Sequence, residues 1–186
     1  MESVETLAIS GAVWEKDLLE DTSVRQLVLE HYDREQLSLR KYVGFLGIDP
    51  ETSREIVQET FLKLQEHLLA GGDQTNLRAW LYRVAHNLTR NSQVAFRSSK
   101  TDLLADVTVA GDPPARAESA ERELLERERL SGVNAAIRRL SAAQRGCLVL
   151  RAQGLKYREI AEVLNLSIST VGENIQRGLE KLKEML

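Results

Sequence analysis

The sequence predicts an all-α protein with two small helical domains joined by a flexible linker, the C-terminal domain containing a helix-turn-helix. Helix-forming residues dominate, and only 3 Pro and 11 Gly interrupt them. Apolar residues recur at helical spacing, except around Gly111 and Pro113-Pro114, where the period is lost. We expect four segments: an unassigned N-terminal extension (1–22), a helical domain (23–100), a linker (101–129) and a second helical domain (130–186).

Two helices are expected at the start of the first domain. The helical period begins at about Ser23 and is interrupted by a turn over 44–50. Asp49-Pro50 suits the start of the next helix, because proline is well tolerated at the first helical position. That helix should run to about Leu69, where Gly71-Gly72 ends it.

A third long helix is expected from about Asn76 to Phe96, with Trp80 and its apolar neighbours facing inward. After the linker, a helix should resume near Glu118, and further helices should follow from about Gly132.

The stretch 157–177 has the pattern of a helix-turn-helix. Asn165 tolerates the positive φ that a tight turn demands, and Ser167 is a good N-cap for the following helix. Two short helices joined by such a turn can place a recognition helix in the DNA major groove. The alternative is a helical hairpin that only packs. In the first helix of this motif, three apolar residues at i, i+3 and i+4 form one face: Ile160, Val163 and Leu164.

Charge is segregated along the chain. The net charge of −3 argues weakly against nucleic acid, but the stretches 74–100 and 131–158 contain no Asp or Glu. An acidic protein can therefore present two local positive surfaces.

Several protein classes are not expected. No run of about 18 apolar residues is present, and the acidic N-terminus does not have the form of a signal peptide. A single cysteine, Cys147, leaves no internal disulfide framework. We expect a cytoplasmic protein.

No catalytic or metal site is expected either. The three histidines, His31, His67 and His86, lack metal-ligand spacing. Without a nucleophile, phosphate loop or paired carboxylates, we expect no enzyme activity, no cofactor and no metal.

Two sequence motifs in the first domain distinguish between possible functions of the helix-turn-helix. Residues 55–63 read Glu-Ile-Val-Gln-Glu-Thr-Phe-Leu-Lys, and residues 80–87 read Trp-Leu-Tyr-Arg-Val-Ala-His-Asn. Followed by the helix-turn-helix, they resemble the bacterial RNA polymerase sigma factors, most closely the two-domain extracytoplasmic-function branch. The resemblance covers about 23–100 and 130–186. It implies three partners: RNA polymerase core (clamp coiled coil and flap), promoter DNA and an anti-sigma factor.

The resemblance assigns the first string to polymerase binding on the clamp coiled coil. The positions lie at i, i+3, i+4 and i+7, so they share one helical face. A solvated polar face is the alternative. The family often has an acidic residue where Arg54 stands, so this contact can differ in detail. The implied polymerase-binding residues are Glu55, Gln58, Glu59 and Leu62.

The resemblance assigns the second string to the minus-ten promoter element. Arginine and lysine neutralise phosphates, Asn87 can read a base edge, and Phe96 or His86 can stack on a base. The loop after Phe96 is expected to hold an everted base. Trp80 is interpreted as a core anchor, and Tyr82 stays undecided. The implied contacts are Arg83, Asn87, Arg90, Asn91, Phe96, Arg97 and Lys100.

The resemblance assigns the last helix to the minus-thirty-five element. Hydroxyls at a helix start suit phosphates, Asn174 suits adenine, and Glu173 can accept from cytosine. The family often carries Lys or Arg where this chain has Gly172-Glu173, so upstream binding is expected to be weaker or differently specific. The implied contacts are Ser169, Thr170, Glu173, Asn174 and Arg177, with Arg151, Lys156 and Tyr157 beside the backbone.

Two alternatives remain open. One is a stand-alone helix-turn-helix transcription regulator, which has no need of the clamp-docking string. The other is a sigma-derived protein-interaction module with weakened DNA binding, suggested by Arg54 and by the acidic last helix.

Overall fold

The computed structural model describes the backbone of residues 3–99 and 132–185, and the side chains of residues 22–95 and 132–185. Every regular element in these ranges is helical, which confirms the predicted fold class. The expected linker (101–129) and the helix near Glu118 lie outside the described residues. The helices are α1 (Ser3–Phe45), α2 (Pro50–Leu69), α3 (Leu77–Ser99), α5 (Ala142–Ala152), α6 (Tyr157–Leu164) and α7 (Ile168–Met185).

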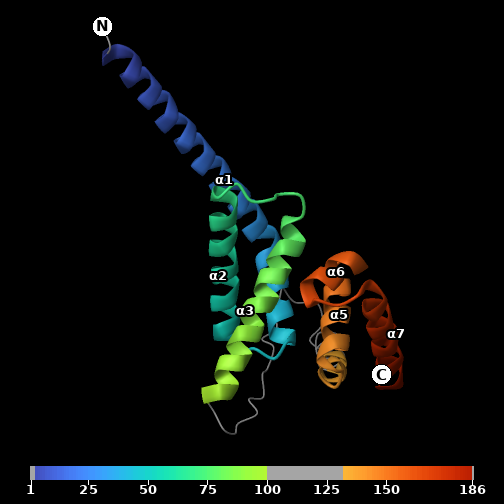
Figure 1. Ribbon diagram of the computed structural model, residues 1–186. Helices are drawn as coiled ribbons and strands as arrows, with labels where there is room; N and C mark the ends of the chain where they lie inside the picture. Colours follow the sequence, from blue (N-terminus) through green and yellow to red (C-terminus); the bar gives the residue numbers. More distant parts are fainter. Residues whose placement is uncertain (1–2, 100–131, 186) are drawn as a thin grey trace, which may run out of the picture.

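The first three helices form an N-terminal bundle, in which α1, α2 and α3 run in alternating directions (Figure 1). The second half of α1 packs against α2 and α3, whereas its first half extends beyond them. The helical period was expected to begin near Ser23, but the backbone is already helical from Ser3. The core of the bundle is apolar and includes Leu39, Tyr42, Val43, Phe61, Leu64, Leu81 and Ala85.

Local chemistry explains where α2 begins and ends. The Asp49 carboxylate accepts hydrogen bonds from the backbone N–H groups of Glu51 (3.1 Å) and Thr52 (3.0 Å), as an N-cap does. Pro50 follows at the first helical position, as predicted. Beyond Leu69 the chain reverses through Gly71, whose φ of +73° favours glycine.

The C-terminal domain contains the predicted helix-turn-helix. Asn165 ends α6 with φ +52°, and its backbone N–H bonds to the carbonyl of Ala161. The Ser167 hydroxyl then accepts from the Thr170 N–H (3.1 Å) and caps α7. A helical stretch over 132–138 and α5 complete the domain, and buried Val171 and Ile175 attach α7 to it.

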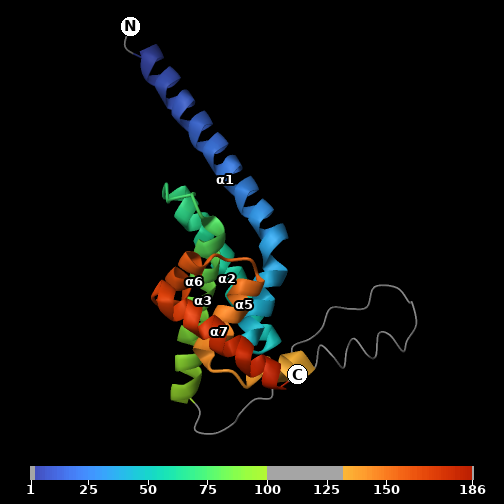
Figure 2. The same cartoon turned by 90° about the vertical axis from the view of Figure 1, so that its right-hand side faces the viewer.

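The two domains touch each other. Helix α6 packs beside α3, and α5 contacts α1 (Figures 1 and 2). Because of this contact, apolar residues from both domains join one buried cluster.

Candidate polymerase and nucleic-acid interfaces

One face of α2 is mostly polar and exposed to solvent. Glu55, Gln58, Glu59 and Leu62 are all exposed, and Leu62 exposes 57% of its surface. The opposite face, with Ile56, Val57, Phe61 and Leu64, is buried in the bundle and fixes the helix orientation. The structure therefore brings the four predicted polymerase-binding residues together on one surface.

The ion pair on this face is exposed and weak. Lys63 lies 3.1 Å from Glu59, and both side chains are substantially exposed. Exposed i,i+4 pairs contribute only about 0.3–0.5 kcal/mol, so a binding partner can displace this one easily. Arg54 pairs with Glu51 at 2.8 Å, one turn before the face.

A second polar stripe runs along α3. Arg83, Asn87, Arg90 and Asn91 are exposed and lie at i, i+4, i+7 and i+8, hence on one side of the helix. The side chains of Phe96 and Arg97, all of Lys100, and the loop expected to hold an everted base lie outside the described residues. The four described residues form an accessible surface that suits phosphates and base edges.

The aromatic residues of α3 have structural contacts. Trp80 is partly buried and stacks on His67, with ring centroids 4.8 Å apart, in agreement with its interpretation as an anchor. Tyr82, undecided from the sequence, is fully buried, and burial raises its pKa to about 12. His86 hydrogen-bonds through Nδ1 to the Tyr42 hydroxyl (2.8 Å), which ties this half-buried ring to the bundle.

Three of the predicted upstream contacts gather beside the start of α6. Arg151, Lys156 and Tyr157 are exposed, and the Arg151 guanidinium lies 5.8 Å from the centre of the Tyr157 ring. A Cβ at Gly172 would lie 3.8 Å from Tyr157, so the ring lies close to the first turns of α7.

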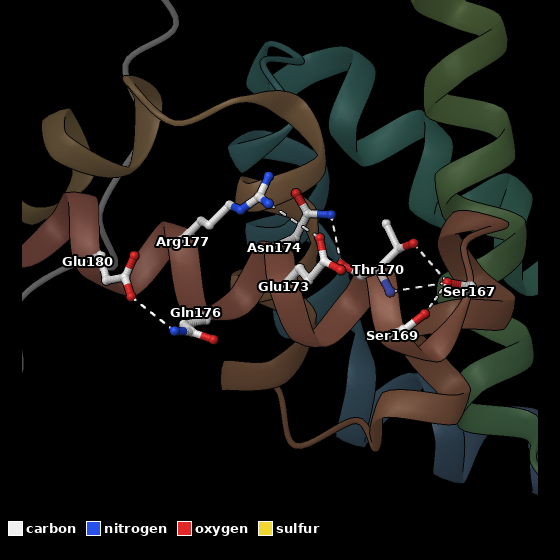
Figure 3. A network of polar contacts seen from close by, with 8 residues as sticks. All are labelled: Ser167, Ser169, Thr170, Glu173, Asn174, Gln176, Arg177 and Glu180. Carbon is white, nitrogen blue, oxygen red and sulfur yellow. Dashed lines mark hydrogen bonds and ion pairs between the residues drawn. The ribbon is translucent and has the colours of Figure 1, made fainter.

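The exposed side of α7 carries a network of polar contacts (Figure 3). The Ser167 hydroxyl meets those of Ser169 (2.8 Å) and Thr170 (2.7 Å), and Asn174 Nδ2 donates to the Thr170 carbonyl (2.8 Å). Further along, Arg177 lies 3.5 Å from Glu173. The predicted base-reading residues are thus bonded within their own helix, and contact with DNA would exchange these bonds.

Sequence reasoning did not single out three polar residues that join the two domains. Asn76 Nδ2 donates to Glu159 Oε1 (2.9 Å), and Arg78 donates to the carbonyl oxygen of Gln153. Arg145 donates to the carbonyl oxygen of Phe45 (3.1 Å). The acid-free stretches contain both arginines, but nothing in their spacing indicates their partners.

A cavity of about 410 Å³ lies where α6 meets the connection between α2 and α3. The stacked rings of His67 and Trp80 line it, together with Arg83 and, from the C-terminal domain, Glu162. One predicted minus-ten residue, Arg83, therefore shares a cavity with a carboxylate of the other domain.

The remaining chemistry is sparse in the part of the chain that the structure describes. No group of three or more potential metal ligands occurs there, and no helix there is long and apolar enough to cross a membrane. Cys147 is buried, and burial raises the pKa of its thiol to about 11, so it packs as a small apolar residue.

Comparison with known proteins identifies the family. The description "Sigma-70 region 2" matches residues 17–100, and "Sigma-70, region 4" matches residues 132–182. RNA polymerase sigma factor SigZ of Bacillus subtilis is 32% identical over 158 residues, which are 83% of this chain and 84% of the relative. The RNA polymerase sigma-H factor of Pseudomonas aeruginosa is 32% identical over 146 residues, 74% of this chain and 75% of that one.

The ECF RNA polymerase sigma factor SigW of Bacillus subtilis is 29% identical over 143 residues, covering 72% of this chain and 75% of its own. The fold is similar to that of CnrH in complex with the cytosolic domain of CnrY (TM-score 0.63, 22% identity, 90% of this chain and 92% of that chain). It is also similar to that of RpoE in complex with the anti-sigma factor NepR from Bartonella quintana (TM-score 0.63, 23% identity, 84% and 94%). The chain therefore belongs to the RNA polymerase sigma factors, in their extracytoplasmic-function branch, which bind polymerase core and direct promoter-specific initiation of transcription.

Proposed function

We propose that the three exposed faces divide the work of initiation: α2 binds the clamp coiled coil of polymerase core, α3 contacts the minus-ten element, and α7 contacts the minus-thirty-five element. The observation that carries this proposal is that the described members of the α2 set and of the α3 set each share one accessible face, while the upstream set lies on α7 and beside the start of α6. We set the functional units at 23–100 and 130–186, with 1–22 as an extension and 101–129 as the linker.

On α2, the proposed partner is a basic or mixed surface with an apolar spot. Glu55, Gln58 and Glu59 offer two carboxylates and an amide, and Leu62 adds an exposed apolar side chain beside them. Interfaces combine such an apolar centre with a polar rim. Within the C-terminal domain, we propose a second polymerase contact with the flap.

On α3, Arg83 and Arg90 are proposed to bind phosphates, and Asn87 and Asn91 to bind bases or sugars. Neutralising phosphates releases counterions, so binding should weaken steeply as the salt concentration rises. Arg97 and Lys100 would extend the same basic stretch, and Phe96 would supply the stacking ring.

On α7, Ser169 and Thr170 are proposed to contact phosphates near the helix start, while Glu173, Asn174 and Arg177 reach base edges. Arg151, Lys156 and Tyr157 would bind the adjacent backbone. Since Glu173 holds Arg177 at 3.5 Å, the pair can read neighbouring bases only after it separates.

An anti-sigma factor is the proposed inhibitory partner. The titles of two solved structures with this fold name such partnerships: CnrH with CnrY, and RpoE with the anti-sigma factor NepR. We further propose that the protein has no catalytic activity of its own and acts in the cytoplasm, where bacterial polymerase and chromosomal DNA are found.

Core binding by α2 can be tested with a matched pair of double variants. Gln58→Ala with Glu59→Ala should weaken capture of polymerase core at least tenfold, measured by titration of labelled core. Gln26→Ala with Glu30→Ala changes the same residue types at exposed positions of α1, away from this face, and should bind like the wild type. Equal core affinity of the two double variants would remove α2 from the clamp contact.

Run-off transcription separates the remaining alternatives. Holoenzyme reconstituted with this chain should select a promoter from a randomised template library and produce transcripts. Core binding without transcripts from any template would favour the interaction module. DNA binding without core binding would favour the stand-alone regulator.

A further inference from the structure

Helix α1 is longer than the bundle that it belongs to. Its Tyr32 ring meets the Phe61 ring of α2 edge to face, with ring centroids 5.0 Å apart, and the two helices run antiparallel. Leu69, the last residue of α2, lies eight residues after Phe61 and is therefore level with Val24, eight residues before Tyr32. The part of α1 that starts at Ser3 and precedes Val24 thus projects past the end of α2 (Figures 1 and 2).

This projecting segment, residues 3–23, has no helix beside it among those that the structure describes. At 1.5 Å per residue it is about 30 Å long. Most helical stability in proteins comes from packing a face against a neighbour rather than from intrinsic propensity. Gly11, in the middle of the segment, is among the weakest helix formers. A partner that packs along the segment would supply the stabilisation that the bundle does not.

The sequence of the projecting segment indicates the chemistry of that partner. Apolar residues recur on one side of the helix, at spacings of three, seven and four residues: Val4, Leu7, Trp14 and Leu18. Residues 1–22 contain six acidic residues and only one basic residue, Lys16. A partner therefore has to offer an apolar seat together with positive charge. Promoter DNA and a second copy of the segment are both negatively charged and do not fit.

The exposed face of α2 leads towards the projecting segment. The row that contains Glu59 and Leu62 continues at the same helical spacing through Glu66 and Leu69 to the end of α2. All four residues are exposed, and Leu69 exposes 54% of its surface. Acidic and apolar residues alternate along this row. The row and the projecting segment therefore suit the same kind of partner, a basic surface with apolar spots.

We propose that the projecting segment is a second contact with RNA polymerase core, which extends the α2 surface onto a basic, partly apolar region beside the clamp coiled coil. The inference rests on the proposed role of α2. Residues 3–16 precede the stretch that matches region 2, so this contact is additional to those of that region. Because the segment and the bundle share one continuous helix, the second contact becomes intramolecular once α2 is seated.

Paired alanine variants of the full-length chain test the contact. Trp14→Ala with Leu18→Ala should weaken binding of labelled core by about tenfold or more, because a buried tryptophan is a common anchor of an interface. Ile9→Ala with Val13→Ala removes two apolar residues from the other side of the same helix and should bind core like the wild type. The packed part of α1 begins at Val24, so neither pair should change the urea unfolding transition.

The comparison of the two pairs is decisive. Wild-type core affinity in both pairs, or an equal loss in both, would overturn the contact. A second copy as the true occupant would appear as a dimer in sedimentation that Trp14→Ala with Leu18→Ala dissociates, with core affinity unchanged. That result would also overturn the proposal.

Hydrogen exchange locates the contact separately from α2. Backbone amides of residues 3–23 should exchange about tenfold or more slowly in the complex with core than in the free chain. At saturating core, the Gln58→Ala, Glu59→Ala chain should retain this protection, and the Trp14→Ala, Leu18→Ala chain should lose it. Unprotected amides in a saturated wild-type complex would overturn the inference and leave the α2 contact standing. Protection that persists while the α2 variant binds core like the wild type would count against the α2 contact alone.

Discussion

Replacing Gly178 with alanine will test how closely α5 and α7 approach each other. Gly178 is buried, and a Cβ there would lie 2.7 Å from Leu148 Cδ1 and 3.3 Å from Leu148 Cγ. Rotation about χ2 can move Cδ1 away, but it leaves Cγ in place. Part of the overlap therefore remains unless Leu148 changes χ1 or the helices separate.

The expected effect is a balance of two opposing contributions. Overpacking a core lowers the free energy of unfolding by about 1–3 kcal/mol. Replacing a glycine inside a helix with alanine raises it by about 0.5–1 kcal/mol. Gly178→Ala should therefore lower the free energy of unfolding by about 1 kcal/mol. Gly172 lies in the same helix, where a Cβ would be 3.8 Å from Tyr157, an ordinary contact. Gly172→Ala should raise the free energy of unfolding by about 0.5–1 kcal/mol.

Urea denaturation followed by circular dichroism provides the measurement, with both variants compared against the wild type. The sign of the change is more decisive than its size, because the two variants share a helix, a residue type and a substitution. If Gly178→Ala stabilises the chain as much as Gly172→Ala, Leu148 gives way freely. The close crossing of α5 and α7 would then not depend on the missing side chain.

Three further outcomes are expected. Asn165→Val should destabilise the C-terminal domain by roughly 1–3 kcal/mol in denaturant titrations, because a β-branched residue is strained at φ +52°, while Asn165→Gly should be nearly neutral. Burial, aided by Arg90, lowers the pKa of His86 below 6.5, so the unfolded chain binds the proton more readily. The free energy of unfolding should therefore fall as the pH drops below 6.5, and His86→Gln should reduce that fall in denaturation at about pH 7.5 and about pH 5.5. Arg177→Ala should weaken binding of the upstream element by about 1–3 kcal/mol in a DNA titration, and a loss under about half a kcal/mol would remove Arg177 from the contacts.

Helix ends could be predicted from the sequence because capping acts over a few residues. Asp49 and Pro50 begin α2, Asn165 makes the left-handed turn, and Ser167 caps α7. The buried faces followed from helical periodicity for the same reason, since each face repeats every three or four residues.

The contacts between domains could not be predicted in this way. Arg145 reaches a carbonyl 100 residues away and Arg78 one 75 residues away, and backbone carbonyls have no signature in the sequence. Exposure alone also cannot separate a binding face from a solvated one, because both consist of the same polar residues. The roles of the α2, α3 and α7 faces therefore stay predictions.

Glu159 accepts two separate hydrogen bonds, one at the start of α6 and one from the other domain. Its Oε2 accepts from the Lys156 N–H at the start of α6 (2.6 Å), while Oε1 accepts from Asn76. Since each oxygen has its own donor, undocking breaks only the second bond and leaves the first turn of α6 intact. The start of α6 is therefore capped from within the C-terminal domain and does not depend on the N-terminal bundle.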